Sequence, residues 1–168
     1  MAVRRRPARG ARGQHFLRSK RLAADLVADA ELARGDLVLE IGGGTGVLTE
    51  ALAQAGARVL VLERDPALVT QLHGRFGRRP GITVVQADAS EHDWPDEPFA
   101  VVANLPFARS GAILARLLRD PHLPLRKAHV IVQRLAPALG FAREARAWQL
   151  DAEQWARLFA FARGLENG

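Results

Sequence analysis

Short apolar runs alternate with stretches of helical periodicity along most of this chain. The runs are four or five residues long and rich in β-branched side chains, which is typical of strands buried on both faces. They cover residues 37–41, 59–62, 82–85, 99–103 and 129–132. Between them, residues 45–55, 66–76 and about 110–118 have helical patterns. This alternation predicts an α/β fold with a doubly wound, Rossmann-like parallel sheet, in which ligands bind at the carboxyl ends of the strands.

Helical spacing also precedes and follows these runs. After Ser19, which can cap a helix, apolar residues recur at helical spacing until Gly35-Asp36. Residues 151–157 begin with a capping box and predict a helix, whereas 158–162 fit either a helix or a strand. The 168 residues are 48% hydrophobic, enough for one core. We therefore expect a single domain over 19–168, preceded by an arm over 1–18.

The charge of this chain is concentrated in that arm. The net charge is +6, but residues 1–24 hold eight of the 24 basic residues and none of the 18 acidic ones. Arginine forks match phosphate geometry, and the interspersed proline and glycines disfavour regular structure. The pattern favours a flexible arm that binds a polyanion such as nucleic acid, with a solubilising tail as the alternative. Its binding residues would be Arg4, Arg5, Arg6, Arg9 and Arg12.

Several classes of protein are disfavoured by composition. The chain has no cysteine, so disulfides and thiolate metal sites are excluded, and the histidines lack metal-ligand spacing. No apolar stretch approaches the length of a membrane span, and the N-terminus lacks the apolar segment of a secretory signal. We expect a cytoplasmic monomer that binds neither metal nor membrane.

A glycine-rich turn follows the first predicted strand. Gly42, Gly44 and Gly46 form a G-x-G-x-G pattern after Glu40, whereas dinucleotide sites use G-x-G-x-x-G. A carboxylate near this turn suits the ammonium group of S-adenosylmethionine better than a pyrophosphate. Taken alone, the motif leaves the choice of cofactor open.

Acidic residues at the ends of the next two strands favour S-adenosylmethionine. Glu63 ends the second strand, where a carboxylate can accept hydrogen bonds from both ribose hydroxyls. Asp88, after the third strand, can accept the adenine amine, and the Ala89 N–H is available to a ring nitrogen. Together with Glu40, these acids predict one cofactor site at the carboxyl edge of the sheet.

The fourth strand runs into Asn104-Leu105-Pro106-Phe107. An asparagine oxygen and a neighbouring backbone carbonyl can accept both hydrogens of an exocyclic base amine, turning its lone pair toward a methyl donor, while an aromatic ring stacks on the base. Pro106 restricts Leu105 to an extended conformation and aims its carbonyl. The alternative is an ordinary turn that ends a strand.

Five motifs in this order resemble the rRNA adenine N6-dimethyltransferases, which include the erythromycin-resistance (Erm) enzymes and their KsgA relatives of the small subunit. The similarity covers about residues 13–134. Its motifs are Gly13-Gln14-His15-Phe16-Leu17, residues 40–49, Glu63-Arg64-Asp65, Asp88-Ala89 and Asn104-Leu105-Pro106-Phe107.

This resemblance implies an S-adenosylmethionine-dependent rRNA adenine N6-methyltransferase with a class I fold. It implies that Gln14, His15 and Leu17 hold the methionine end of the cofactor and that Gly42 lines it. Glu63 would bind the ribose and Asp88 the adenine, while Asn104, Leu105 and Phe107 would hold the target base. The basic arm and the amino-acid sequences of residues 101–104 and 132–134 are more similar to the Erm branch than to the KsgA branch. That branch implies methylation of 23S rRNA and macrolide-lincosamide-streptogramin resistance.

Two departures from the family pattern leave alternatives open. His15 replaces the usual asparagine, which would weaken the cofactor contact or make it pH-dependent. The sequence also ends at Gly168 without the family's helical C-terminal domain, as a minimal enzyme, a truncated one or a degenerate copy would. The alternative functions are a methyltransferase for another amine and a non-catalytic RNA-binding or ribosome-assembly module.

Overall fold

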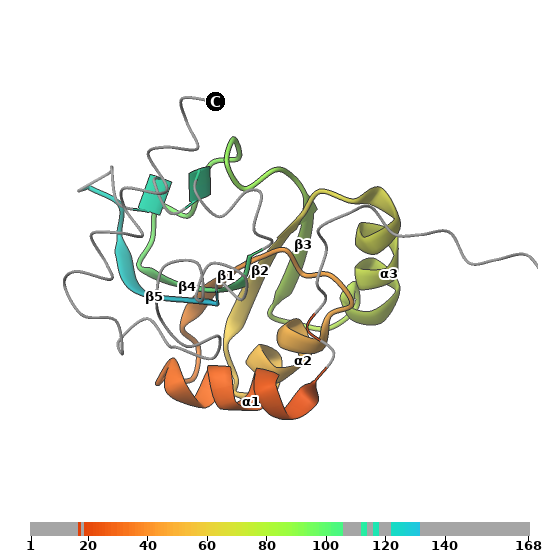
Figure 1. The fold of residues 1–168 in the computed structure, drawn as a ribbon, viewed down its shortest axis with the longest axis horizontal. Coiled ribbons are helices and arrows are strands. Elements are labelled where there is room, and N and C mark those ends of the chain that lie inside the picture. The colour runs from red at the N-terminus through yellow and green to blue at the C-terminus, as the bar shows by residue number, and fades with distance from the viewer. Residues whose placement is uncertain (1–16, 18, 106–111, 114–115, 118–121, 132–168) are drawn as a thin grey trace, which may run out of the picture.

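The described part of the chain forms a parallel sheet. The computed structural model describes residues 17, 19–105, 112–113, 116–117 and 122–131. Within them, five strands lie in the order β3-β2-β1-β4-β5, and every neighbouring pair is parallel (Figure 1). The strands are β1 Leu37–Ile41, β2 Arg58–Glu63, β3 Ile82–Gln86, β4 Phe99–Asn104 and β5 Leu125–Ile131. The predicted α/β class with a parallel sheet is confirmed.

Three helices lie together on one side of this sheet: α1 Lys20–Asp29, α2 Val47–Gln54 and α3 Pro66–Phe76 (Figure 1). Their starts follow local rules. The Ser19 hydroxyl accepts a hydrogen bond from the Leu22 N–H (3.2 Å), as predicted. Asp65 caps α3 by accepting from the Ala67 N–H (2.8 Å), with Pro66 in the first turn. Residues 112–113 and 116–117 are also helical and lie on the opposite side of the sheet.

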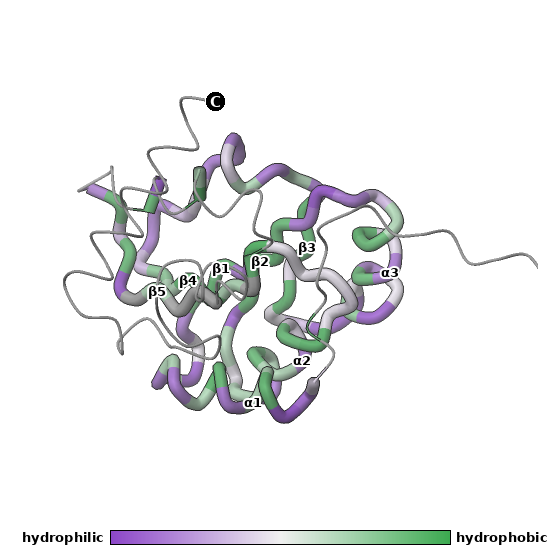
Figure 2. The backbone as a smooth tube through the Cα atoms, viewed as in Figure 1, coloured by the Kyte–Doolittle hydropathy of each residue, from purple (hydrophilic) through white to green (hydrophobic). Residues whose placement is uncertain are grey.

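The sheet separates two layers of apolar side chains. Along β1 and β2, alternate residues such as Val38, Val59 and Val61 pack against the three helices. The intervening residues, such as Leu39 and Leu62, join a second cluster that contains Trp94, Phe99, Ile113 and Leu117. In Figure 2 the apolar colour runs along β1, β2 and β3, whereas the helices alternate between apolar and polar colour. Burial on both faces explains why β1 and β2 read as continuous apolar runs.

The burial of β3 and the starts of β5 and α2 differ from those predicted. Burial on both faces is wrong for β3, whose residues are half-buried or exposed, because β3 lies at an edge of the described sheet. Strand β5 begins at Leu125, four residues before the predicted start, because pairing with β4 rather than apolar content sets its length. Helix α2 begins at Val47, two residues later than predicted, because Gly46 has a φ of 77°.

The approach of α3 to the glycine-rich turn gives a stability prediction. A Cβ at Gly43 would lie 2.5 Å from Val61 Cγ1 and 2.9 Å from Leu72 Cδ1, and both neighbours are fully buried. We expect Gly43→Ala to lower the free energy of unfolding by about 1–3 kcal/mol through overpacking. Gly74 in α3 is the matched control, because its Cβ would meet nothing within 4 Å. Gly74→Ala should raise stability by about 0.5–1 kcal/mol, and urea titrations of both variants test the contrast.

Candidate functional site

The register of the sheet brings the predicted residues of three strands to one level. Ile41 of β1 pairs with Leu62 of β2 and with Ala103 of β4. The next residue of each strand therefore lies at the shared carboxyl edge: Gly42, Glu63 and Asn104. The ladder continues past the strand ends, since the Gly42 N–H donates to the Leu62 carbonyl at 2.8 Å. This edge is the candidate ligand site expected for a doubly wound sheet.

The glycine-rich turn at this edge is packed tightly against α3. Gly46 has a φ of 77°, and a Cβ there would lie 2.6 Å from a ring carbon of Phe76. The Arg75 guanidinium donates to the Thr45 carbonyl in the same turn. Sequence reasoning did not single out Arg75, because nothing in the spacing of α3 indicates a contact 30 residues away. The turn is thus held in shape before any ligand binds.

Glu63, the last residue of β2, also holds the glycine-rich turn through a hydrogen bond. Its Oε2 accepts a hydrogen bond from the Gly44 N–H (3.0 Å). Its Oε1 accepts from the N–H groups of Arg64 (2.9 Å) and Asp65 (3.0 Å). The residue is only 5% exposed. A carboxylate has about four lone-pair positions, so capacity remains for a ribose hydroxyl beside these three backbone donors.

Glu40 lies deeper than its predicted role suggests. It is fully buried on β1 and faces Thr49 of α2. In the part of the chain that the structure describes, neither carboxylate oxygen has a hydrogen bond of normal geometry. Burial raises the pKa of Glu40 to about 8; Thr49 lowers it by less, and the charge of Glu63 raises it further. Glu40 therefore lies in the core beside α2, and its contact with a ligand stays a prediction.

The raised pKa of Glu40 predicts a pH-dependent stability. The folded protein holds a proton on Glu40 that the unfolded chain, with a pKa near 4.5, releases. Between about pH 4.5 and 8 this group should make the free energy of unfolding fall with rising pH, by up to about 1.4 kcal/mol per unit. We expect Glu40→Gln to remove this slope, as measured by urea unfolding at pH 5, 6.5 and 8.

The exposed Glu91 offers a control for that measurement. Glu91→Gln should keep the slope of the unaltered protein. A slope that persists in Glu40→Gln would show that it does not come from Glu40.

The loop after β3 completes the edge. The Ala87 N–H donates to the Glu63 carbonyl (3.0 Å), which continues the pairing of β2 and β3. Asp88 Oδ1 then accepts hydrogen bonds from the Ser90 N–H (3.0 Å) and hydroxyl (2.6 Å). Asp88 is half-buried and Ala89 is buried. The predicted adenine-binding pair thus lies in an ordered turn next to Glu63.

The structure brings together fewer than half of the predicted site residues, because many of the others lie outside the described residues. Those at or beneath the carboxyl edge are Glu40, Gly42, Gly44, Gly46, Glu63, Asp88, Ala89, Asn104 and Leu105. Leu17 is buried in the core layer under the helices, so its contact with a cofactor also stays a prediction. The remainder lie outside the described residues: Gln14, His15, Pro106, Phe107 and the arginines Arg4, Arg5, Arg6, Arg9 and Arg12.

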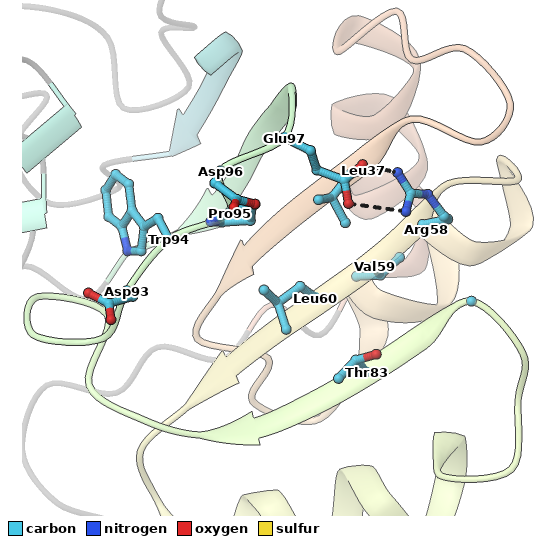
Figure 3. A pocket seen from close by; sticks show the side chains of 11 residues that line it. Leu37, Arg58, Val59, Leu60, Thr83, Asp93, Trp94, Pro95, Asp96 and Glu97 are labelled. Atoms are coloured by element: carbon cyan, nitrogen blue, oxygen red, sulfur yellow. Dashed lines mark hydrogen bonds and ion pairs between the residues drawn. The ribbon is translucent and has the colours of Figure 1, made fainter. Parts of the chain in front are cut away.

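A cavity of about 700 Å³ opens at the other end of the sheet (Figure 3). It is lined by the first residues of β1 and β2, Leu37 and Arg58, and by the loop before β4. Arg58 and Glu97 form a two-pronged ion pair there, at 2.7 and 3.3 Å. Because ligands of such sheets bind at the carboxyl ends of the strands, this cavity lies apart from the candidate site.

Comparison with known proteins identifies the family. A family model described as ribosomal RNA adenine dimethylase matches residues 6–144. The chain belongs to the ribosomal RNA adenine dimethylase family. Its fold is the Rossmann-like class I fold of S-adenosylmethionine-dependent methyltransferases, as its structural neighbours also have.

The similar proteins match different shares of this chain. A probable ribosomal RNA small subunit methyltransferase A of Methanosarcina mazei is 45% identical over 106 residues, covering 63% of this chain and 39% of the relative. The ribosomal RNA small subunit methyltransferase A of Synechococcus elongatus is 39% identical over 131 residues, covering 73% and 47%. The crystal structure of the 23S rRNA methyltransferase ErmE is 32% identical with a TM-score of 0.63, covering 76% of this chain and 54% of that one. The chain thus spans less than half the length of these two curated relatives.

Among the described residues, no group of three or more histidine, cysteine or acidic side chains is arranged to hold a metal ion. None of the helices described there is long and apolar enough to cross a membrane.

Proposed function

We propose that this chain transfers a methyl group from S-adenosylmethionine to the N6 amine of an adenine in ribosomal RNA. The observation that carries the proposal is the convergence of Glu63, Asp88 and Asn104 at the carboxyl edge of one sheet, around a preformed glycine-rich turn. Membership of the dimethylase family supports the same reaction.

The protein groups act by binding and orientation. The Glu63 carboxylate accepts hydrogen bonds from the ribose hydroxyls of the cofactor, while Asp88 and the Ala89 N–H recognise its adenine. The Asn104 side-chain oxygen and the Leu105 carbonyl accept the two hydrogens of the target amine, and Phe107 stacks on the extruded base. The sulfonium supplies the methyl group, and its sulfur keeps the electron pair of the broken bond. Orientation carries most of the rate, because the amine becomes acidic once methylated and needs no strong base.

The ribosomal subunit is the finer part of the proposal. Similarity to the 23S rRNA methyltransferase ErmE and the basic arm support a large-subunit target, with macrolide-lincosamide-streptogramin resistance as the consequence. The 45% identity to the Methanosarcina small-subunit enzyme favours the small subunit as a second candidate. Since either target is ribosomal, we place the protein in the cytoplasm, and we propose that it acts as a monomer.

One labelling experiment separates these functions. The protein is incubated with methyl-labelled S-adenosylmethionine and, in parallel, with 50S subunits, 30S subunits, free rRNA and a cell extract. Label on N6 of adenine in 23S rRNA supports the large-subunit target, and label in 16S rRNA supports the small-subunit one. Label in protein or small molecules indicates a different amine substrate. RNA binding without label indicates a non-catalytic module.

The contribution of the arm is tested by deleting residues 1–12, which removes Arg4, Arg5, Arg6, Arg9 and Arg12. We expect weaker RNA binding and a flatter plot of log K against the logarithm of the salt concentration. The slope should fall in magnitude by up to about 0.7–0.9 for each phosphate that the arm no longer neutralises. Cofactor affinity should not change, because the motif that begins at Gly13 remains. Salt titrations of both forms against one RNA hairpin provide the measurement. Superimposable slopes would identify the arm as a solubilising tail.

A further inference from the structure

Arg116 holds the loop that follows β3. It belongs to the helical residues that follow the Asn104–Phe107 motif, yet its guanidinium reaches the loop after β3. Its Nη1 donates to the carbonyls of Ala89 (3.0 Å) and His92 (2.5 Å). Its Cζ lies 4.4 Å from the centroid of the Trp94 ring, within cation–π range. An arginine with these three contacts is held in a defined place.

Trp94 shares the same acceptor. Its Nε1 donates to the Ala89 carbonyl at 3.0 Å. The ring packs edge-on against Phe99 of β4, with centroids 6.3 Å apart and an interplanar angle of 80°. Trp94 is only 9% exposed, and its outer side lines the cavity of Figure 3. The Ala89 carbonyl is therefore held by two donors that the core itself keeps in position.

Fixing this carbonyl also orients Asp88. The Ala89 oxygen and the Ser90 N–H belong to one planar peptide unit, so fixing the oxygen sets the direction of the N–H. That N–H donates to Asp88 Oδ1 at 3.0 Å. Contacts thus run from Arg116 and Trp94 through one peptide to the Asp88 carboxylate, which recognises the adenine amine in the proposed function.

We propose that Arg116, stacked on Trp94, is a positioning residue that sets the specificity of the cofactor site for a 6-aminopurine. The proposal rests on the proposed function, because it concerns the cofactor that function requires. Arg116 does not contact the ligand; it acts through the Ala89–Ser90 peptide.

Calorimetry with two probes tests this role in the full chain. The probes are S-adenosylhomocysteine and its analogue in which hydrogen replaces the adenine amine. We expect Arg116→Gln to weaken the binding of S-adenosylhomocysteine about tenfold and that of the analogue less than about twofold. Only S-adenosylhomocysteine carries the amine that the Asp88 carboxylate accepts. Arg116→Lys keeps the charge but not the planar fork, and should lose part of the preference for S-adenosylhomocysteine over the analogue. Trp94→Phe keeps a ring without the Nε1 donor, and should also lose part of it.

The matched control is Arg126→Gln, which removes an exposed arginine paired with Asp36 (3.2 Å), remote from the carboxyl edge. It should keep the full preference. Equal weakening of both probes in Arg116→Gln would overturn the proposal and leave Arg116 a merely structural role. If Arg116→Gln does not fold, Arg116→Lys and Trp94→Phe decide: a retained preference in both overturns the proposal. An unaltered protein that binds no S-adenosylhomocysteine refutes the proposed function itself, whereas one that binds both probes equally refutes only the adenine contact.

Discussion

Replacement of Asn104 by alanine is expected to reduce methyl transfer by at least about 10²-fold while the affinity for S-adenosylmethionine stays within about twofold. Asn104 is the last residue of β4, in register with Ile131 of β5, so its place at the carboxyl edge is set by the sheet. In the proposed function its oxygen orients the target amine. That interaction gains strength as the nitrogen attacks, so its loss raises the barrier more than it weakens binding.

Single-turnover methylation of rRNA, together with calorimetry for the cofactor, measures both effects. Gln54→Ala is the matched control, because it removes an exposed carboxamide of α2 that bonds only Glu50 in the described chain. This control should keep full activity. Near-normal turnover with lost cofactor affinity in Asn104→Ala would move Asn104 from the target-base side to the cofactor side.

Replacement of Glu63 by glutamine is expected to weaken S-adenosylhomocysteine binding about ten- to a hundredfold, or roughly 1.5–3 kcal/mol. The carboxylate accepts three backbone N–H groups and has capacity for a ribose hydroxyl. A glutamine can keep its oxygen toward Arg64 and Asp65 only by turning its NH₂ group toward the Gly44 N–H. The variant therefore loses charge at the ribose and the anchor of the glycine-rich turn together.

Calorimetry gives the dissociation constant, and urea unfolding shows how much of the loss comes from a loosened turn. The control is Glu97→Gln, since Glu97 is a half-exposed glutamate paired with Arg58 at the far end of the sheet. Its cofactor affinity should be unchanged. An unchanged dissociation constant in Glu63→Gln would remove Glu63 from the site and reopen the choice of cofactor.

Local patterns predicted much of this fold. The apolar pattern predicted both ends of β1 correctly. Ser19 and Pro66 marked helix starts that the structure confirms. These features depend on neighbouring residues alone: period, capping and the fixed φ of proline. Local patterns were less reliable where pairing decides, as at the start of β5, because hydrogen bonding to β4 extends a strand through Arg126 and Lys127.

By itself, then, the sequence determined the parallel sheet, the family motifs and the chemistry expected at the strand ends. Only the tertiary structure decided how those motifs are held. Glu63 binds the turn 19 residues before it, Arg75 reaches back 30 residues to Thr45, and Arg116 reaches back 27 to Ala89. It also decided that Glu40 is buried with a pKa near 8. Such contacts and burial arise from the packing of whole elements, which no spacing along the chain encodes.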